Sequence, residues 1–191
     1  MLGVILCGGQ SSRMGEDKGL YRFKGEAWAQ LAFKKVSGLD LKTVLSINSN
    51  QLQDYNSIFL NDELIPDHPG LNIAGPLLGI ISVHRRFPVE DFLVLACDLP
   101  NMKSDVLGEL LNQYKNNDGD EVITFKVGEQ IEPLCSIYTA KGLAKILALH
   151  DKRTLVRQSM IHVLETLRTK YLVPNESWKP FFKNMNSRLD L

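Results

Sequence analysis

The residues best suited to chemistry lie in one glycine-rich segment near the start of the chain, directly after a short apolar run. Residues 6–18 read LCGGQSSRMGEDK. Glycines allow backbone N–H groups to approach phosphates closely, and the side chains of Arg13 and Lys18 can neutralise the charge of a triphosphate. The segment therefore indicates a phosphate-binding loop, although a glycine-rich turn without a ligand would also fit the pattern.

The spacing of the glycines in this segment differs from that of two common nucleotide loops. It does not read Gly-x-Gly-x-x-Gly, and no Gly-Lys-Ser/Thr closes it. The first difference argues against a dinucleotide-dependent oxidoreductase, and the second argues against the phosphate loop of ATPases. The loop therefore predicts a nucleotide-binding protein of another type.

A carboxylate, Asp98, follows a second apolar run in the sequence ACDLP at residues 96–100. In a doubly wound fold, ligands bind beyond the carboxyl ends of the strands. Magnesium prefers one or two carboxylates together with substrate phosphates. We therefore expect Asp98 to hold Mg²⁺, with the capping of the following turn as the alternative role.

Short apolar runs alternate with segments of helical spacing, and this alternation predicts the elements that position the loop and Asp98. We expect strands at residues 2–7, 43–47, 63–65 and 92–97, and helices at residues 27–36, 77–87 and 105–114. Pro76 suits a first helical turn, and Ser104 suits an N-cap. The pattern predicts an α/β fold with a doubly wound, mostly parallel sheet.

The second half of the chain has less regular patterns. We expect strands at residues 121–125 and 133–138 in a more exposed part of the sheet, and helices at residues 141–150 and within 155–167. The tail, residues 171–191, contains Trp178, Phe181 and Phe182, so we expect it to pack back on the protein. A length of 191 residues suits a single domain over residues 1–191.

Composition and charge restrict the classes of function. Basic and acidic residues both number 22, and the resulting net charge of zero argues against a large basic field for nucleic acid. Cys7, Cys97 and Cys135 lie in apolar runs, which favours reduced, buried thiols and a reducing compartment. The first apolar run is too short for a signal peptide or membrane span, so we expect a cytoplasmic protein without a membrane partner. The histidines show no zinc-ligand spacing with the cysteines.

Several of these segments together resemble the molybdenum cofactor guanylyltransferases, within the wider α/β nucleotidyltransferases. The resemblance covers nearly the whole chain and includes the loop, Asn48-Ser49-Asn50, Asp67, GPLLG at residues 75–79, CDLP at 97–100 and NMNS at 184–187. It implies a Rossmann-like nucleotidyltransferase fold and transfer of GMP from GTP to molybdenum-bound molybdopterin, with release of pyrophosphate. It also implies proteins of molybdenum insertion and molybdoenzyme maturation as partners.

Carried over to this sequence, the resemblance also implies roles for individual residues. The nucleotide contacts fall on Leu6, Cys7, Gly8, Gly9, Lys18, Asn48, Asp67 and Asp98, with Mg²⁺ on Asp98. The catalytic residues are Arg13, Lys18 and Asp98, and the pterin contacts are Asn184 and Asn186. The two asparagines would otherwise form a simple turn before the chain end. Cys7 stands where alanine is more usual, but a thiol is small enough to leave a backbone contact intact.

Two further positions have alternative interpretations. Asp67 follows a short strand and can accept the two adjacent donors of guanine, or it can merely shape the turn into Pro69-Gly70. Glu132 begins the segment Glu132-Pro133-Leu134, which can flank an acceptor pocket or serve a purely structural role.

Several other functions stay open at the level of the sequence. A cytidylyltransferase for the same pterin and a sugar-phosphate nucleotidyltransferase share the first loop, whereas the chain length and the NMNS ending favour the guanylyltransferase. A non-catalytic nucleotide-binding module would keep the fold. The presence of Arg13, Lys18 and Asp98 together argues against such a module.

Overall fold

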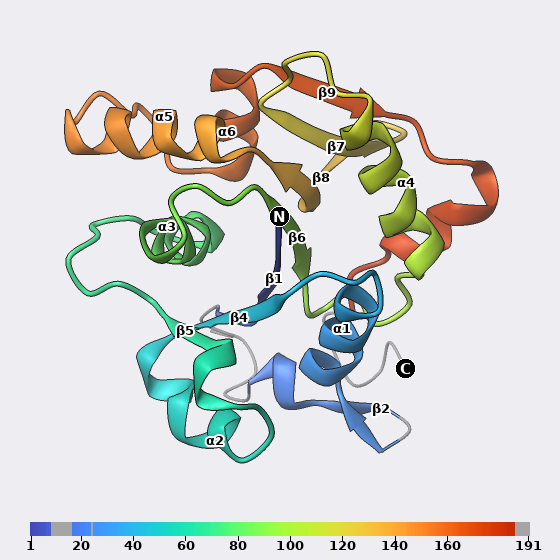
Figure 1. Ribbon diagram of the computed structural model, residues 1–191. Helices are drawn as coiled ribbons and strands as arrows, with labels where there is room; N and C mark the ends of the chain where they lie inside the picture. Colours follow the sequence, from blue (N-terminus) through green and yellow to red (C-terminus); the bar gives the residue numbers. More distant parts are fainter. Residues whose placement is uncertain (9–16, 24, 186–191) are drawn as a thin grey trace.

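The computed structural model describes residues 1–8, 17–23 and 25–185, and it is built around one seven-stranded sheet (Figure 1). In spatial order the strands are β5 (Leu64–Pro66), β4 (Thr43–Ile47), β1 (Leu2–Leu6), β6 (Phe92–Ala96), β8 (Gln130–Tyr138), β7 (Val122–Val127) and β9 (Thr169–Leu172). The first four strands run parallel, β8 is antiparallel to both β6 and β7, and β9 is parallel to β7. The mostly parallel sheet predicted from the sequence is confirmed.

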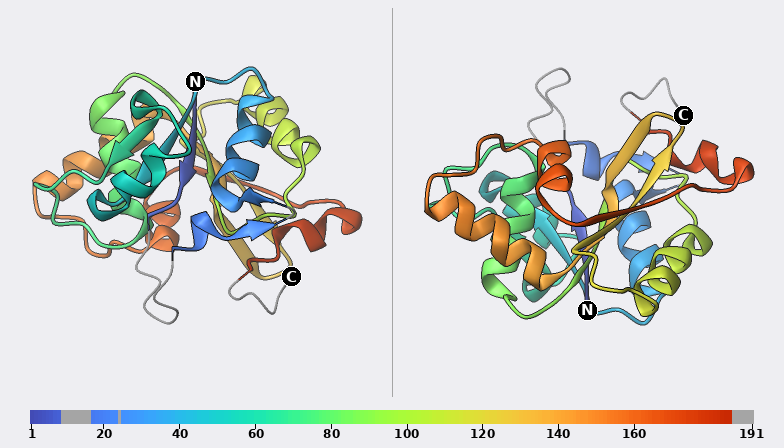
Figure 2. Two further views of the ribbon diagram at one scale, coloured as in Figure 1. Left: turned by 90° about the horizontal axis from the view of Figure 1, so that it is seen from below. Right: turned by 90° about the horizontal axis from the view of Figure 1, so that it is seen from above.

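Helices cover both faces of this sheet (Figures 1 and 2). On one face, α1 (Trp28–Ser37) and α4 (Ser104–Lys115) pack against strand residues such as Ile5, Leu45 and Leu93. On the other face, α3 (Pro76–Arg86), α5 (Ala140–Asp151) and α6 (Met160–Thr166) pack against strand residues such as Val4, Val44 and Val94. Because neighbouring strand residues point to opposite faces, the continuous apolar runs fill both layers of the core.

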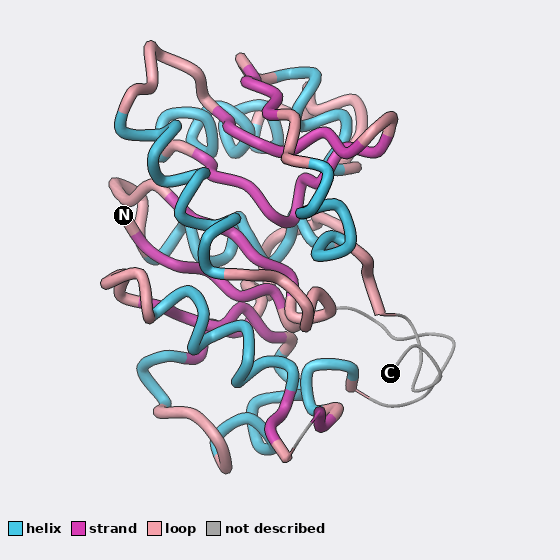
Figure 3. Tube along the Cα trace, turned by 90° about the vertical axis from the view of Figure 1, so that its right-hand side faces the viewer, coloured by secondary structure: helices cyan, strands magenta, loops and turns pink. Residues whose placement is uncertain are grey.

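Shorter elements lie between the strands of the sheet or follow the last one. They are α2 (Leu52–Asn56), the 3₁₀ helices η1 (Lys18–Leu20), η2 (Ser49–Gln51), η3 (Asn61–Glu63) and η4 (Glu176–Phe182), and the two-stranded ribbon of β2 (Arg22–Phe23) and β3 (Glu26–Ala27). Figure 3 shows the strands succeeding one another from one end of the molecule to the other, with helices packed over them. None of the helices in the part of the chain that the structure describes is long and apolar enough to cross a membrane.

Of the two residues predicted to start helices, one has the predicted role in the structure and the other does not. Pro76 occupies the first turn of α3 as predicted, directly after Gly75, which has a φ of 67°. Ser104 is instead the first residue of α4, and the extended Lys103 occupies the cap position. The N-cap role predicted for Ser104 is therefore wrong, because its backbone is already helical.

Strand and helix ends also shift by a few residues. Glu63 belongs to η3, where its carboxylate accepts a hydrogen bond from the Leu60 backbone N–H at 2.9 Å, so β5 begins one residue later than predicted. The helix expected within residues 155–167 is confined to α6, whose Ser159 cap accepts a hydrogen bond from the His162 N–H at 3.3 Å. Local side-chain bonds thus set these boundaries.

The strands at the β7 and β8 end of the sheet are buried, which corrects the expectation of a more exposed region. Ile123, Phe125 and Ile137 are at most 1% exposed. The cover comes from α4 and from the C-terminal part of the chain, where the Phe182 ring of η4 meets the Phe125 ring edge-on at 5.1 Å. The prediction that the aromatic tail packs back on the protein is confirmed.

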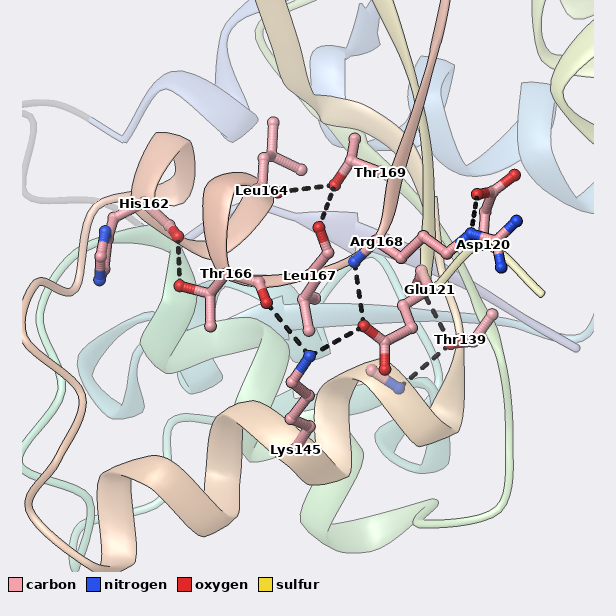
Figure 4. Close-up of polar contacts among 11 residues, drawn as sticks. Asp120, Glu121, Thr139, Lys145, His162, Leu164, Thr166, Leu167, Arg168 and Thr169 are labelled. Carbon is pink, nitrogen blue, oxygen red and sulfur yellow. Dashed lines mark hydrogen bonds and ion pairs between the residues drawn. The ribbon is translucent and has the colours of Figure 1, made fainter.

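The strand β9 was not predicted, and a buried carboxylate fastens the chain at its start (Figure 4). Glu121 accepts hydrogen bonds from the Arg168 backbone N–H at 3.0 Å and from the Lys145 Nζ at 3.2 Å. Lys145 Nζ also donates to the Thr166 carbonyl at 3.1 Å. Although burial acts to raise the pKa of Glu121, these partners outweigh it and lower that pKa. The network joins α5, the end of α6 and the start of β9.

Candidate active site

The carboxyl ends of β1, β4, β5 and β6 meet at one edge of the sheet. Backbone hydrogen bonds continue the ladder past these ends: Cys7 N–H donates to the Ser46 carbonyl at 2.9 Å, Cys97 N–H to the Leu6 carbonyl at 3.1 Å, and Asp67 N–H to the Ile47 carbonyl at 2.8 Å. Those residues predicted to contact nucleotide that the structure describes therefore gather at this edge, as expected for a doubly wound sheet.

Two adjoining cavities open at this edge. The smaller has a volume of about 200 Å³ and is lined by residues that include Cys7, Asp17, Lys18, Asp98 and Leu134. The larger has a volume of about 680 Å³ and is lined by residues that include Ser46, Asn48, Asp67 and Gly79. Leu6, Gly8 and Pro76 line both, so the two cavities are compartments of one cleft.

Lys18 and Asp98 form an ion pair in the smaller cavity, with 4.0 Å between Lys18 Nζ and Asp98 Oδ2. Each side chain is about a quarter exposed. Burial raises the pKa of Asp98, and the charge of Lys18 acts in the opposite direction. The pair thus combines a cation and a carboxylate that a polyphosphate bearing a metal ion can approach.

The residues at this edge fit a magnesium ion shared with substrate phosphates better than a cation held by protein alone. Within residues 1–8, 17–23 and 25–185, no three or more His, Cys, Asp or Glu side chains are grouped to hold a metal. A second carboxyl group, that of Glu132, is only 6% exposed. Burial and then the charge of Asp98 raise its pKa to about 7. The accessible carboxylate of Asp98 therefore suits an ion whose remaining ligands come from phosphates.

Asp67 lines the larger cavity and is half-buried, and burial raises its pKa. The turn that follows is held by His68, whose Nδ1 accepts a hydrogen bond from Gly70 N–H at 3.1 Å and whose carbonyl accepts one from Leu71 N–H at 3.1 Å. Since the neighbouring histidine closes the turn, the carboxylate of Asp67 is available to the cavity.

Two glycines allow the elements around the larger cavity to approach closely. A Cβ atom at Gly79 would lie 2.3 Å from Ser46 Oγ, so a larger residue there would force Ser46 or α3 to move. A Cβ atom at Gly8 would lie 3.6 Å from the Asn48 backbone nitrogen and 3.9 Å from Asp67 Oδ2. Three residues from three separate strand ends are therefore in close proximity.

Cys7 and Gly8, which follow β1 at the start of the glycine-rich loop, use their backbone donors within the protein. The N–H groups of Cys7 and Gly8 both donate to the Ser46 carbonyl, at 2.9 and 3.1 Å. The expectation that such groups face phosphate is therefore not met by these two residues, whose contribution is the shape of the cleft. Gly9 and Arg13 lie outside the described residues.

The C-terminal motif reaches the same site. Met185 N–H donates to the Asp98 carbonyl at 3.0 Å, and the Met185 side chain is buried with Tyr21 and Trp28. The preceding residue, Asn184, is exposed. Asn186 lies outside the described residues. Asn184 therefore directly precedes a residue whose backbone is bonded to Asp98, on the side of the smaller cavity.

Sequence reasoning missed one polar group of the cleft and its partners. Asp17 lines the smaller cavity and accepts hydrogen bonds from Gln51 and Tyr55. A partial signal was present, because Gln51 follows Asn48 by three residues, the spacing of a capping box. The link of this box to Asp17, at a sequence separation of 34 residues, carried no local signal.

Comparison with known protein families shows to which family the chain belongs. The model of the MobA-like NTP transferase domain matches residues 3–168. The chain belongs to this family. It is therefore a nucleotidyltransferase. The family resemblance carried by the loop, Asp67 and Asp98 is confirmed.

Curated relatives support the same assignment over nearly the full chain. A protein of Bacillus cereus (strain B4264) named "Probable molybdenum cofactor guanylyltransferase" is 30% identical over 97% of this chain and 91% of its own length. A protein of Geobacillus sp. (strain WCH70) with the same name is 29% identical over 98% of this chain and 94% of its own length.

Solved structures share the fold. Molybdopterin-guanine dinucleotide biosynthesis protein A from Archaeoglobus fulgidus has a TM-score of 0.77 at 22% identity, covering 100% of this chain and 94% of that one. The bifunctional IspDF from Campylobacter jejuni has a TM-score of 0.75 at 15% identity, covering 100% of this chain and 53% of that one. The acceptor must accordingly be argued from the site, because one fold can serve different chemistries.

Proposed function

We propose that this nucleotidyltransferase moves GMP from GTP to molybdenum-bound molybdopterin and releases pyrophosphate. The observation that carries the proposal is the Lys18–Asp98 pair in a cavity that adjoins a larger one lined by Asp67. This arrangement offers a cation and a carboxylate for phosphates, and a second carboxylate for a base. The names of the relatives from Bacillus and Geobacillus support the same reaction.

The smaller cavity would receive the α-phosphate of GTP. Lys18 would donate to its non-bridging oxygens, where negative charge increases as the acceptor oxygen attacks and pyrophosphate leaves. The acceptor is a phosphate and is already anionic at neutral pH, so the reaction requires positioning rather than a general base. Bound Mg²⁺ would supply charge neutralisation at the α- and β-phosphate oxygens, and Asp98 would hold it.

The larger cavity would receive the guanine base. Guanine presents two adjacent donors, N1–H and the exocyclic amine, which one carboxylate can accept together. Asp67 is half-buried in this cavity, and the turn beside it is closed by His68 instead. Cytosine lacks such a donor pair. Asp67 would therefore read the guanine edge, with Asn48 beside it.

The pterin would enter from the side of the C-terminal motif. Asn184 lies one residue before Met185, whose N–H is bonded to the carbonyl of Asp98. A side chain at this position can contact the acceptor while its phosphate approaches the Lys18–Asp98 pair. The proposed pterin contacts are Asn184 and, beyond the described residues, Asn186.

A pyrophosphate-release assay with molybdenum-loaded molybdopterin and each of GTP, CTP, ATP and UTP tests the proposal. We expect turnover with GTP. Asp67→Asn should lower the ratio of kcat/KM for GTP to that for CTP by about ten- to a hundredfold, because an amide donor would face a guanine donor at a cost of about 1–3 kcal/mol. Asp62→Asn, on the exposed surface of η3, is the matched control and should leave the ratio unchanged.

The other outcomes identify the alternatives. A preference for CTP would make the protein a cytidylyltransferase for the same pterin. Turnover with a sugar phosphate in place of the pterin would make it a sugar-phosphate nucleotidyltransferase. Nucleotide binding without pyrophosphate release with either acceptor would contradict the proposed transfer reaction.

A further inference from the structure

Gln51, at the end of η2, uses its whole side-chain amide inside the protein. Its Nε2 donates to the Cys7 carbonyl at 3.1 Å and to Asp17 Oδ2 at 2.5 Å, and its Oε1 accepts from the Asn48 N–H at 2.8 Å. The residue is only 8% exposed. One buried amide therefore joins the ends of β1 and β4 to the segment that begins η1.

Asp17, the partner of Gln51, is held from two more directions. Its Oδ1 accepts hydrogen bonds from the Gly19 N–H at 2.8 Å and from the Tyr55 hydroxyl at 3.2 Å. The Tyr55 ring is fully buried and stacks on Phe59. The position of Asp17 is thus determined by groups on η1, η2 and α2.

Each segment joined by Gln51 carries a residue of the proposed nucleotide site. Cys7 and Gly8 follow β1, Asn48 follows β4, and Lys18 directly follows Asp17. Lys18 begins η1, a 3₁₀ helix whose N-cap is the Asp17 side chain. Since Asp17 fixes the start of this short helix, it also limits where the Lys18 side chain can begin.

We propose that Gln51 is a positioning residue, which together with Asp17 holds Lys18 opposite Asp98 before the nucleotide binds. The inference rests on the proposed transfer reaction, in which Lys18 acts on the α-phosphate. Groups that are already in place need no reorganisation when charge develops at the phosphate, which favours the transition state over the ground state. Gln51 itself touches no reacting atom and acts through Asp17 and the Cys7 carbonyl.

Gln51→Leu removes all three bonds and leaves an apolar side chain that is one atom shorter. We expect kcat to fall by about 10- to 100-fold, because a displacement of a catalytic group by about 1 Å has effects of that size. The Kd for GTP, measured by fluorescence titration without acceptor, should change by about threefold at most, since Gln51 makes no ligand contact. Gln53→Leu is the matched control, because Gln53 is exposed two residues further along the chain.

A polarity-reversed pair separates positioning from general stability. In Gln51→Glu, a carboxylate would face Asp17, and in Asp17→Asn, an amide would face the Gln51 amide, so both single variants should be slow. In the double variant, the amide introduced at position 17 can donate to the carboxylate introduced at position 51, whereas the bond to the Cys7 carbonyl stays lost. The recovery should therefore be partial, with kcat about tenfold above that of Gln51→Glu at about pH 7.5. Gln51→Glu alone should also recover as pH falls, because the new carboxyl group can donate to Asp17 once it is protonated.

Hydrogen exchange provides a readout that does not depend on the acceptor. The Gly19 and Asn48 N–H groups bond to Asp17 and Gln51, so both should exchange faster in Gln51→Leu and regain protection in the double variant. If these exchange differences appear but the wild type shows no turnover with GTP, the transfer reaction is wrong while the positioning network stands. If folded Gln51→Leu keeps wild-type kcat, or the double variant is no faster than Gln51→Glu, the positioning role is refuted.

Discussion

Replacing the buried acid Glu132 with glutamine should change how the stability of the protein depends on pH. Burial, followed by the charge of Asp98, raises the pKa of Glu132 from 4.5 to about 7. The folded protein therefore holds this proton more tightly than the unfolded chain does. The resulting contribution to stability is full below the unfolded pKa of 4.5 and is lost as pH rises through about 7.

The size of the effect follows from the shift. A change from 4.5 to about 7 corresponds to about 3 kcal/mol, since one pKa unit is worth about 1.4 kcal/mol. Solvent in the neighbouring cleft screens part of this, and we expect about 2 kcal/mol. Glutamine keeps the shape of the side chain and carries no charge. The stability of Glu132→Gln relative to wild type should therefore rise by about 2 kcal/mol between about pH 5 and about pH 8.5.

Urea unfolding at the two pH values measures this difference, with the fluorescence of the fully buried Trp28 as the signal. Glu129→Gln is the matched control beside the same β7–β8 hairpin, because the Glu129 side chain is 99% exposed. The difference in unfolding free energy between Glu129→Gln and wild type should be the same at both pH values. The proposed effect of Glu132 is refuted if the stability of Glu132→Gln relative to wild type is the same at both pH values, or if it is lower at the higher pH.

Two further predictions concern the ion pair of the smaller cavity. Asp98→Asn should lower turnover by about a thousandfold and weaken magnesium binding while the fold is kept, because the amide removes the charge expected to hold the ion; a magnesium titration with near-normal turnover would contradict this. Lys18→Ala should lower kcat by about 100-fold and weaken GTP binding by less than about tenfold, because its interaction strengthens in the transition state; a raised KM at unchanged kcat would remove that role.

The central strands could be predicted because their signal is local. Residues such as Val4, Val94 and Leu95 belong to short runs that are apolar at every position, and such runs are typical of strands buried on both faces. Their order in the sheet follows the rules of doubly wound folds. The sequence was therefore sufficient for the α/β class and for the edge at which ligands bind.

The burial of β7 and β8 could not be predicted, because it depends in part on segments that follow much later in the chain. Phe125 is buried by Phe182, and β9 pairs with β7 although β8, α5 and α6 lie between them in the sequence. The segment of β9 has half-exposed polar residues such as Lys170, and this composition carries little strand signal by itself. Its position is instead fastened by Glu121 and Lys145 (Figure 4).

The candidate site likewise contains residues that the sequence could predict and residues that it could not. Lys18 and Asp98 were found because each follows a recognisable segment, whereas their separation of 4.0 Å is a property of the fold. Asp17 and Gln51 were missed because neither carries a local signal that points to a partner 34 residues away. Supporting residues of this kind are identified by hydrogen bonds rather than by residue type.

Cys7 illustrates why a change of residue type in the first loop can leave the site intact. Its N–H donates to the Ser46 carbonyl, its carbonyl accepts from Gln51 Nε2, and its side chain is 6% exposed in the core. Two of the polar partners of this position therefore bond its backbone, and a small side chain fits the space that the core leaves. The contact with the Cys7 thiol, together with burial, raises the pKa of Cys97 well above its usual range. Because a thiol kept protonated is a poor nucleophile, Cys97 contributes packing, and the proposed phosphate chemistry depends on Lys18 and Asp98.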